Sequence, residues 1–159
     1  MPITEEDLEA FLNCETKSYL TFNGVVGVPS EFGQSRKHLR EMYRQTCREQ
    51  LFSVVRDGEC YAGTPDLQSL KSSRYLLIVD YVVAITEIYA RLDALMRIRC
   101  AGIVTDCPYC PIRFVPGEKL TTHDKLLLAF GALAFSKVRE LYSRLAGRSS
   151  RICPTAGWD

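Results

Sequence analysis

The stretch from Asp106 to Val138 reads DCPYCPIRFVPGEKLTTHDKLLLAFGALAFSKV, and it carries the signals of a strand, a turn and an amphipathic helix in succession. Over residues 109–114 the side chains alternate with the period of a half-buried strand. Pro116-Gly117 then predicts a turn that ends the strand. A helix is predicted to follow at Thr121 or Thr122, because either hydroxyl can cap its first turn.

The predicted helix runs from residue 122 to about residue 145. Asp124 favours its first turn, because the N-terminus of a helix carries partial positive charge. Apolar residues recur after it at helical spacing, which predicts a helix with one broad buried face. That face is expected to contain Leu126, Leu127, Phe130, Leu133, Ala134 and Val138.

Helical signals also dominate the N-terminal third of the chain. Thr4 and Asp7 have the spacing of a capping box, so a helix is predicted to begin there and either to end near Cys14 or to resume over residues 17–22. Ser30 can cap a longer helix over residues 31–55. Its apolar positions at helical spacing are Phe32, Leu39, Met42, Tyr43, Cys47, Leu51 and Val54.

Three segments between these helices predict strands. Residues 59–62 favour a short strand, and the β-branched, aromatic run over residues 75–85 favours a buried one. Residues 88–98 alternate as a strand does, but the same pattern also fits a helix. We interpret them as a strand, because they follow the previous strand closely and because the family resemblance described below places a strand there.

Together these elements predict an α/β domain. A small mixed or antiparallel sheet is expected from about Tyr75 to Phe114, flanked by the helices over residues 30–55 and 122–145. The chain of 159 residues suits one domain, predicted over residues 1–146, with an irregular polar tail over residues 147–159.

Composition narrows the classes of function. The formal net charge is +1, so no global basic field indicates nucleic acid, although a local patch can still bind it. No apolar run approaches the ~20 residues that a membrane span needs, and the acidic N-terminus is unlike a signal peptide. Seven cysteines, an odd number, favour reduced thiols, so we expect a cytoplasmic protein without a membrane partner.

Several short segments resemble the RecB-like nuclease family, in the branch whose longer members also carry an RNase H-like domain. The resemblance covers most of residues 3–138 and is most specific between Tyr109 and Phe130. Longer members continue past this point, so the chain is expected to be a truncated or degenerate member. The matching segments are residues 8–14, 17–20, 91–95, 109–114, 118–120 and 124–130.

The resemblance implies the PD-(D/E)XK nuclease fold, incomplete at its C-terminus, and metal-assisted hydrolysis of DNA phosphodiesters. In such enzymes an aspartate on one strand and an acid-x-lysine triplet on the next hold Mg²⁺, which activates water. Asp93 matches the metal-binding aspartate; its other interpretation is an exposed strand residue paired with Arg91 or Arg97. Asp80 is a second candidate metal ligand, because a carboxylate inside an apolar strand needs a partner; its other interpretation is a residue at the solvent-facing end of that strand.

The acid-x-lysine triplet is degenerate in this chain. The aligned residues are Pro111-Ile112-Arg113, where proline has no ligating side chain and arginine keeps its charge but exchanges protons poorly. Glu118 and Lys119, just past the strand, are candidates to supply an acid and a base from a displaced position, so the candidate catalytic set is Asp93, Arg113, Glu118 and Lys119. The following helix has Leu126 and Phe130 where relatives carry glutamine and tyrosine.

Two further features bear on ligands. Arg36, Lys37, Arg40 and Arg44 give the helix over residues 31–55 a basic face, which is either a solvated surface balanced by Glu41 and Glu49 or an edge that follows nucleic-acid phosphates, expected to be those of DNA. Cys107 and Cys110 form a CxxC pair. Zinc or an iron–sulfur cluster would need two more ligands there, such as Cys14 and Cys100, so packing cysteines are the favoured interpretation.

The sequence therefore leaves hypotheses of different classes open. One is a RecB-like nuclease domain that cleaves DNA with Mg²⁺. Another is a catalytically silent relative that binds nucleic acid or a protein through the same sheet and the basic helix. A third is a truncated product without independent activity.

Overall fold

The computed structural model describes residues 1–145 apart from residues 26, 29, 57, 67–68, 71–74, 99–108 and 118, with residues 142–145 described only as the end of a helix. The described residues form the strands β1 (Ile3–Thr4), β2 (Cys60–Ala62), β3 (Leu77–Ala84), β4 (Ile88–Arg97) and β5 (Tyr109–Ile112), and the helices α1 (Glu5–Asn13), α2 (Glu15–Phe22), α3 (Glu31–Val54) and α5 (Thr122–Leu145). The predicted tail lies outside them.

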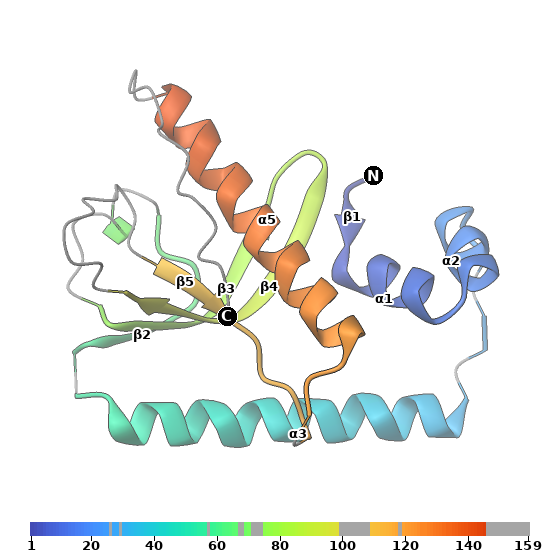
Figure 1. Ribbon diagram of the computed structural model, residues 1–159, viewed down its shortest axis with the longest axis horizontal. Helices are drawn as coiled ribbons and strands as arrows, with labels where there is room; N and C mark the ends of the chain where they lie inside the picture. The colour runs from blue at the N-terminus through green and yellow to red at the C-terminus, as the bar shows by residue number, and fades with distance from the viewer. Residues whose placement is uncertain are drawn as a thin grey trace.

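The strands form one small mixed sheet with the order β1-β4-β3-β2, and β5 also pairs with β4 (Figure 1). The pairs β3–β4 and β4–β5 are antiparallel, whereas β1–β4 and β2–β3 are parallel. The predicted α/β class with a small mixed sheet is confirmed, and the helical alternative for residues 88–98 is wrong. The two-residue strand β1 was not predicted.

Strands β1 and β5 share one edge of β4 and lie at its opposite ends. β1 pairs with the first residues of β4, where Ile3 faces Ile88. β5 pairs with the second half of β4, where Ile112 faces Ala94. Because β1 is parallel and β5 antiparallel to β4, the residues that follow each strand, Glu5 and Arg113, approach each other along this edge.

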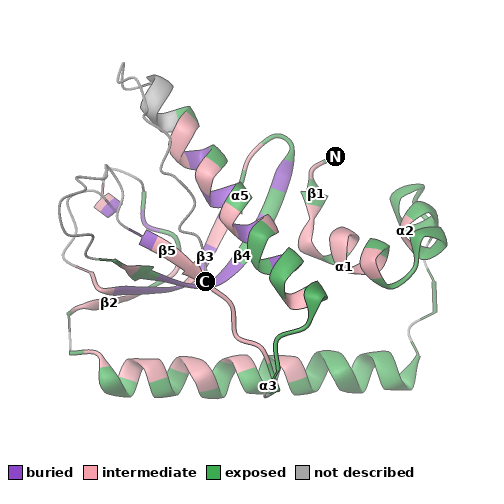
Figure 2. Ribbon diagram, in the orientation of Figure 1, coloured by how far each residue is buried: buried purple, intermediate pink, exposed green. Residues whose placement is uncertain are grey.

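Helices cover both faces of the sheet, so the domain has three layers. On one face, Ala134, Phe135 and Val138 of α5 complete the larger core with residues of β3 and β4. On the other face, Leu51 and Phe52 of α3 pack on a smaller cluster. Figure 2 shows that buried residues concentrate on the central strands and on one side of α5.

In both β3 and β4, the alternation of side chains between the two cores is interrupted at an aspartate. In β3, Leu77 and Val79 belong to the smaller core, but Tyr81 and Val83 belong to the larger one. The residue between them, Asp80, has φ 56°, a left-handed conformation that aspartate tolerates better than most residues. The same exchange occurs in β4 around Asp93. Leu95 therefore lies on the opposite face of the sheet from the one that strict alternation along β4 predicts.

Helices α3 and α5 begin where the sequence predicts but bury fewer of the expected residues. The Ser30 hydroxyl accepts a hydrogen bond from Gly33 N at 3.1 Å, and Thr121 accepts one from Asp124 N at 3.2 Å. α3 has no buried residue. The predicted buried face of α5 is only partly confirmed, because Leu126 is 43% and Leu133 is 51% exposed. Its buried side instead includes Gly131 and Phe135.

The N-terminal segment forms α1 and α2, separated by Cys14, so the resumed helix is the correct alternative. The capping box of Thr4 and Asp7 is present, with Thr4 N donating to the Asp7 carboxylate at 2.8 Å. Cys14 is extended, with φ −166°, and its backbone breaks the helix into two. The capping box begins at Thr4, the last residue of β1, so it fixes the point at which α1 leaves the edge of the sheet.

Candidate functional site

An arginine row on α3 connects that helix to the rest of the domain. Its members, Arg36, Arg40, Arg44 and Arg48, recur every four residues and therefore lie on one side of the helix. Each of the last three pairs with a carboxylate from a different element. The partners are Glu9 of α1 for Arg40, Asp93 of β4 for Arg44, and Asp80 of β3 for Arg48.

The pair of Arg44 and Asp93 is the most enclosed of the three. Arg44 Nε lies 2.7 Å from Asp93 Oδ1, and the Asp93 side chain is only 3% exposed. The second carboxylate oxygen accepts a hydrogen bond from the backbone N–H of Phe114 at 2.8 Å. Both oxygens of Asp93 are thus held by donors from two different elements, as a buried carboxylate requires.

Burial raises the pKa of Asp93, and the positive charge of Arg44 opposes that rise. The hydrogen bond from Phe114 also opposes it. The net direction shows that loss of hydration outweighs the attraction of the cation. Asp93 is therefore a buried, paired carboxylate rather than the exposed strand residue that the sequence suggested as an alternative, and its partner is neither Arg91 nor Arg97.

The pair of Arg40 and Glu9 lies closer to solvent. It is bidentate, with N–O distances of 2.8 and 2.7 Å. The side chains remain 38% and 28% exposed, respectively. The hydrogen bond from Arg40 lowers the pKa of Glu9 against the effect of partial burial, and the same contact raises the pKa of Arg40. One helical turn earlier on α1, Glu5 pairs with Arg113 at the end of β5.

Asp80 is held by two arginines on the same carboxylate. Arg48 lies 2.9 Å from one oxygen and Arg91 lies 2.7 Å from the other. Its hydrogen bond raises the pKa of Arg91. By the register of β3 and β4, Asp80 stands opposite Asp93, yet each aspartate has its own arginine on α3. Asp80 is therefore a paired carboxylate at the point where the strands exchange faces.

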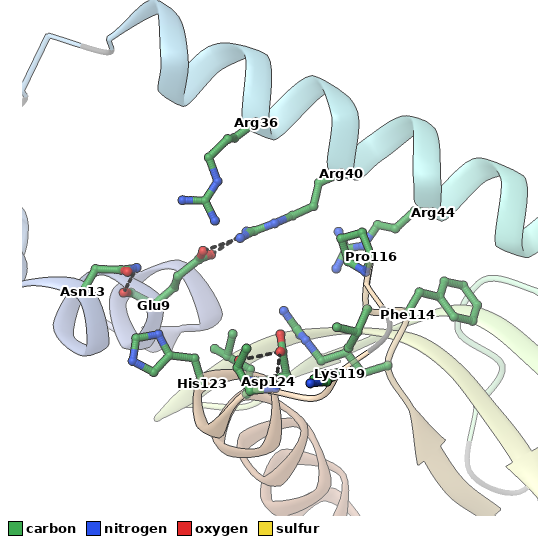
Figure 3. Close-up of a pocket in the computed structure, with 14 residues that line it drawn as sticks. Glu9, Asn13, Arg36, Arg40, Arg44, Phe114, Pro116, Lys119, His123 and Asp124 are labelled. Carbon is green, nitrogen blue, oxygen red and sulfur yellow. Dashed lines mark hydrogen bonds and ion pairs between the residues drawn. The ribbon is translucent and has the colours of Figure 1, made fainter.

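These ion pairs border a cleft of about 460 Å³ between α3, α1, the end of β5 and the start of α5. Figure 3 shows Arg36, Arg40 and Arg44 descending from α3 toward it, with Lys119, His123 and Asp124 on the opposite side. Cationic side chains outnumber carboxylates on its wall. The lining residues that carry charge are Arg36, Arg40, Arg44, Arg113, Lys119, Glu9 and Asp124.

Two of these cations make no salt bridge with any residue that the structure describes. Arg36 is exposed, and its guanidinium carbon lies 5.9 Å from the centre of the Phe32 ring. Lys119 is also exposed and follows the end of β5 on the far wall. Since Arg40, Arg44 and Arg113 are already paired, Arg36 and Lys119 carry most of the uncompensated positive charge of the cleft.

The structure brings together some of the predicted site residues and separates others. Arg36, Arg40, Arg44, Arg113 and Lys119 line one cleft, and Asp93 lies beneath its wall, bonded to two lining residues. Asp80 is not among the lining residues. Lys37 points to solvent, 3.9 Å from Glu6, with 85% of its side chain exposed. Glu118 lies outside the described residues.

The described residues do not fit a Mg²⁺ site at Asp93. Mg²⁺ needs several oxygen ligands in near-octahedral geometry. Here both oxygens of Asp93 face N–H donors, and the matching positions on β5 are Pro111 and Arg113, which offer no oxygen from their side chains. Within the described part of the chain, no three histidine, cysteine or acidic side chains are grouped to hold a metal.

The predicted CxxC pair is only half described. Cys107 and Cys100 lie outside the described residues, whereas Cys110 is a half-buried thiol on β5. Its sulfur lies 3.8 Å from the carbonyl oxygen of Pro111. Cys14 is exposed at the junction of α1 and α2. The interpretation as packing cysteines stays a prediction.

Sequence reasoning missed the acidic side of this site. Glu5 and Glu9 of α1 each neutralise a cleft cation, and neither was singled out. A signal was present, because Glu5 lies within the capping box of Thr4 and Asp7 and Glu9 follows four residues later, so the two glutamates share one helix side. Their partners, however, are 31 and 108 residues away in the chain, which no local pattern specifies.

Comparisons with known proteins leave the family open. The chain matches no protein-family model, no curated protein and no solved structure. The resemblance to RecB-like nucleases, and the PD-(D/E)XK core that it implies, therefore stay predictions from the short segments quoted above. Within the described residues, no helix combines the length and apolar character needed to cross a membrane.

Proposed function

We propose that this domain binds the phosphate backbone of nucleic acid, DNA in the first instance, in the cleft beside α3, as a nuclease-like domain without metal-dependent catalysis. One observation carries the proposal: five cationic side chains from α3, the end of β5 and the following loop converge on one cleft of about 460 Å³. Phosphate oxygens are recognised by arginine and lysine in this way, and arginine can engage them through two N–H groups.

The state of Asp93 supports binding over hydrolysis. In the nuclease interpretation this carboxylate would hold Mg²⁺, but here the guanidinium of Arg44 lies against one oxygen and a backbone N–H against the other. The arginine supplies the positive charge that a buried carboxylate needs. Arg44 of the wall is thus neutralised by Asp93 beneath it, and Arg36 and Lys119, which make no salt bridge with a described residue, remain available for an anion.

The binding test is a titration of a dye-labelled oligonucleotide of about 12 nucleotides, single-stranded or duplex, followed by fluorescence anisotropy. The variant Arg36→Ala/Lys119→Ala should weaken binding about tenfold. It should also make the salt dependence shallower, because a complex with fewer phosphate contacts releases fewer counterions when it forms. The matched control is Arg56→Ala/Lys137→Ala, which removes the same charge from exposed positions outside the cleft.

Equal weakening by both double variants would show only general attraction to positive charge and would contradict the proposal. Absence of binding by the wild-type protein at low salt would also contradict it. A parallel incubation of both DNA forms with Mg²⁺ or Mn²⁺ separates binding from catalysis. Cleavage that disappears in a folded Asp93→Asn variant would favour the nuclease interpretation instead.

A further inference from the structure

Helix α1 places its carboxylates where a bound phosphate would lie. Glu9 lines the cleft and forms a bidentate pair with Arg40, with both N–O distances below 2.9 Å. Glu5 neutralises Arg113 from the same side of the helix. A bidentate contact between a carboxylate and a guanidinium uses the same N–H donors that would hold two phosphate oxygens.

From this geometry we infer that α1 is an internal competitor: Glu9 masks Arg40, and nucleic acid must displace it to occupy the cleft fully. The inference rests on the proposed function, because it concerns regulation of the same cleft. It identifies Arg40 as a phosphate-binding residue that is hidden in the free protein and exposed by the ligand.

The exposure of the pairs shows which contact can exchange. The Glu9 side chain is 28% exposed and that of Arg40 is 38% exposed, so water and ions already reach this pair. Pairs of this exposure contribute little stability and are screened by salt, which makes them replaceable. The Asp93 side chain is 3% exposed and also bonded to the backbone of Phe114, so it stays in place.

The position of α1 permits the exchange without unfolding the sheet. α1 contains no buried residue, and only the side chain of Glu9 has to rotate away from Arg40. Arg36 contributes to the lowered pKa of Glu9 and lies one turn before Arg40, so a phosphate that enters beside Arg36 would compete directly with the Glu9 carboxylate for the guanidinium of Arg40.

The test compares Glu9→Gln with the wild-type protein in the oligonucleotide titration between about 50 and 200 mM salt. Glutamine keeps the size of the side chain and removes its charge. We expect binding to tighten about three- to fivefold, in line with the small contribution of a partly exposed ion pair, and the salt slope to steepen by about one phosphate contact. The matched control, Glu49→Gln, removes one exposed charge from the far half of α3 and should change affinity less than twofold.

A second variant traces the gain to Arg40. Adding Arg40→Gln to Glu9→Gln should return the affinity to the wild-type value or below it. The inference is overturned if Glu9→Gln binds no tighter than wild type, or if Glu49→Gln gives the same gain. If neither the wild type nor Glu9→Gln binds any probe, the proposed function itself fails. Circular dichroism of each variant confirms that the comparison is made between folded proteins.

Discussion

Two ion pairs on neighbouring turns of α3 use the same chemistry in opposite ways. Arg44 and Asp93 lie between the helix and the sheet, and the carboxylate is almost fully enclosed. Arg40 and Glu9 lie one turn away between two helices, where about a third of each side chain reaches solvent. The difference teaches that an arginine row on one helix can form an enclosed ion pair at one position and a partly solvated one at the next.

The two carboxylates also differ in the direction of their pKa. Burial raises the pKa of Asp93, whereas the hydrogen bond from Arg40 lowers the pKa of Glu9. Asp93 therefore tolerates its charge only because Arg44 and Phe114 stay in place. Glu9 gains from its partner while keeping access to water. Three predictions test this contrast.

The largest effect is expected from Asp93→Ala. Removing one partner of an enclosed pair leaves Arg44 without its close carboxylate, with only Glu41 at 4.0 Å, and leaves Phe114 N without its acceptor, which should lower the free energy of unfolding by about 3 kcal/mol. Glu9→Ala, the matched change at the partly exposed pair, should cost less, about 1 kcal/mol. Denaturation with urea, followed by circular dichroism, measures both. Equal costs for the two variants would remove the distinction between the pairs.

A smaller effect is expected from Gly131→Ala, which disturbs the sheet beside Asp93 without changing any charge. A Cβ at Gly131 would lie 2.7 Å from Leu92 Cδ2, so the buried Leu92 must shift. Overpacking costs about 1–3 kcal/mol, and the better helix propensity of alanine returns up to about 1 kcal/mol. We expect a net loss of about 1 kcal/mol in urea denaturation. In the double variant Gly131→Ala/Leu92→Ala, the loss of stability should be smaller than the sum of the losses in the two single variants, because the smaller side chain at position 92 removes the clash.

The smallest effect is a difference in pH dependence. A carboxyl whose pKa is raised by folding contributes stability that is present below its unfolded value, 3.8 for Asp93, and that is lost as the pH rises through the folded pKa. A carboxyl whose pKa is lowered, such as Glu9, contributes stability above its unfolded value of 4.5 and loses it as the pH falls through the folded pKa.

The free energies of unfolding of wild type, Asp93→Asn and Glu9→Gln, measured from neutral pH into the acid range, test these signs. As the pH falls, wild type should gain stability relative to Asp93→Asn and lose it relative to Glu9→Gln. Because every other group is common to the three proteins, their contributions cancel in the differences. Parallel curves for the two variants would show that the pairs do not differ in the way that their burial indicates.

Much of the architecture was predictable because its signals are local. The capping residues Thr4, Ser30 and Thr121 mark helix starts in both sequence and structure. The apolar runs of β3 and β4 fix two central strands, and Pro116-Gly117 ends the chain segment after β5. Each of these signals depends on residues within a few positions of one another, so one sequence is enough to read them.

The site was less predictable because its contacts span the chain. The sequence predicts that Arg40 and Arg44 lie on a basic helix face, but their close partners come from α1 and β4, and Glu41 approaches Arg44 only to 4.0 Å. The family resemblance predicts Asp93 as a metal ligand, but in the structure its oxygens face nitrogen donors. Strand β1 has only two residues and is defined by pairing with β4, which no periodicity could indicate.

The left-handed backbone of Asp80 has a consequence for how the domain comes apart. Because the alternation changes there, the same pair of strands supplies apolar residues to both cores. Neither helical layer can therefore dissociate from the sheet without disturbing the pairing of β3 with β4. Loss of α3 from one side should therefore loosen the opposite side too. The molecule is expected to unfold as one cooperative unit, because the strand segments at the two aspartates connect the cores on the two faces of the sheet.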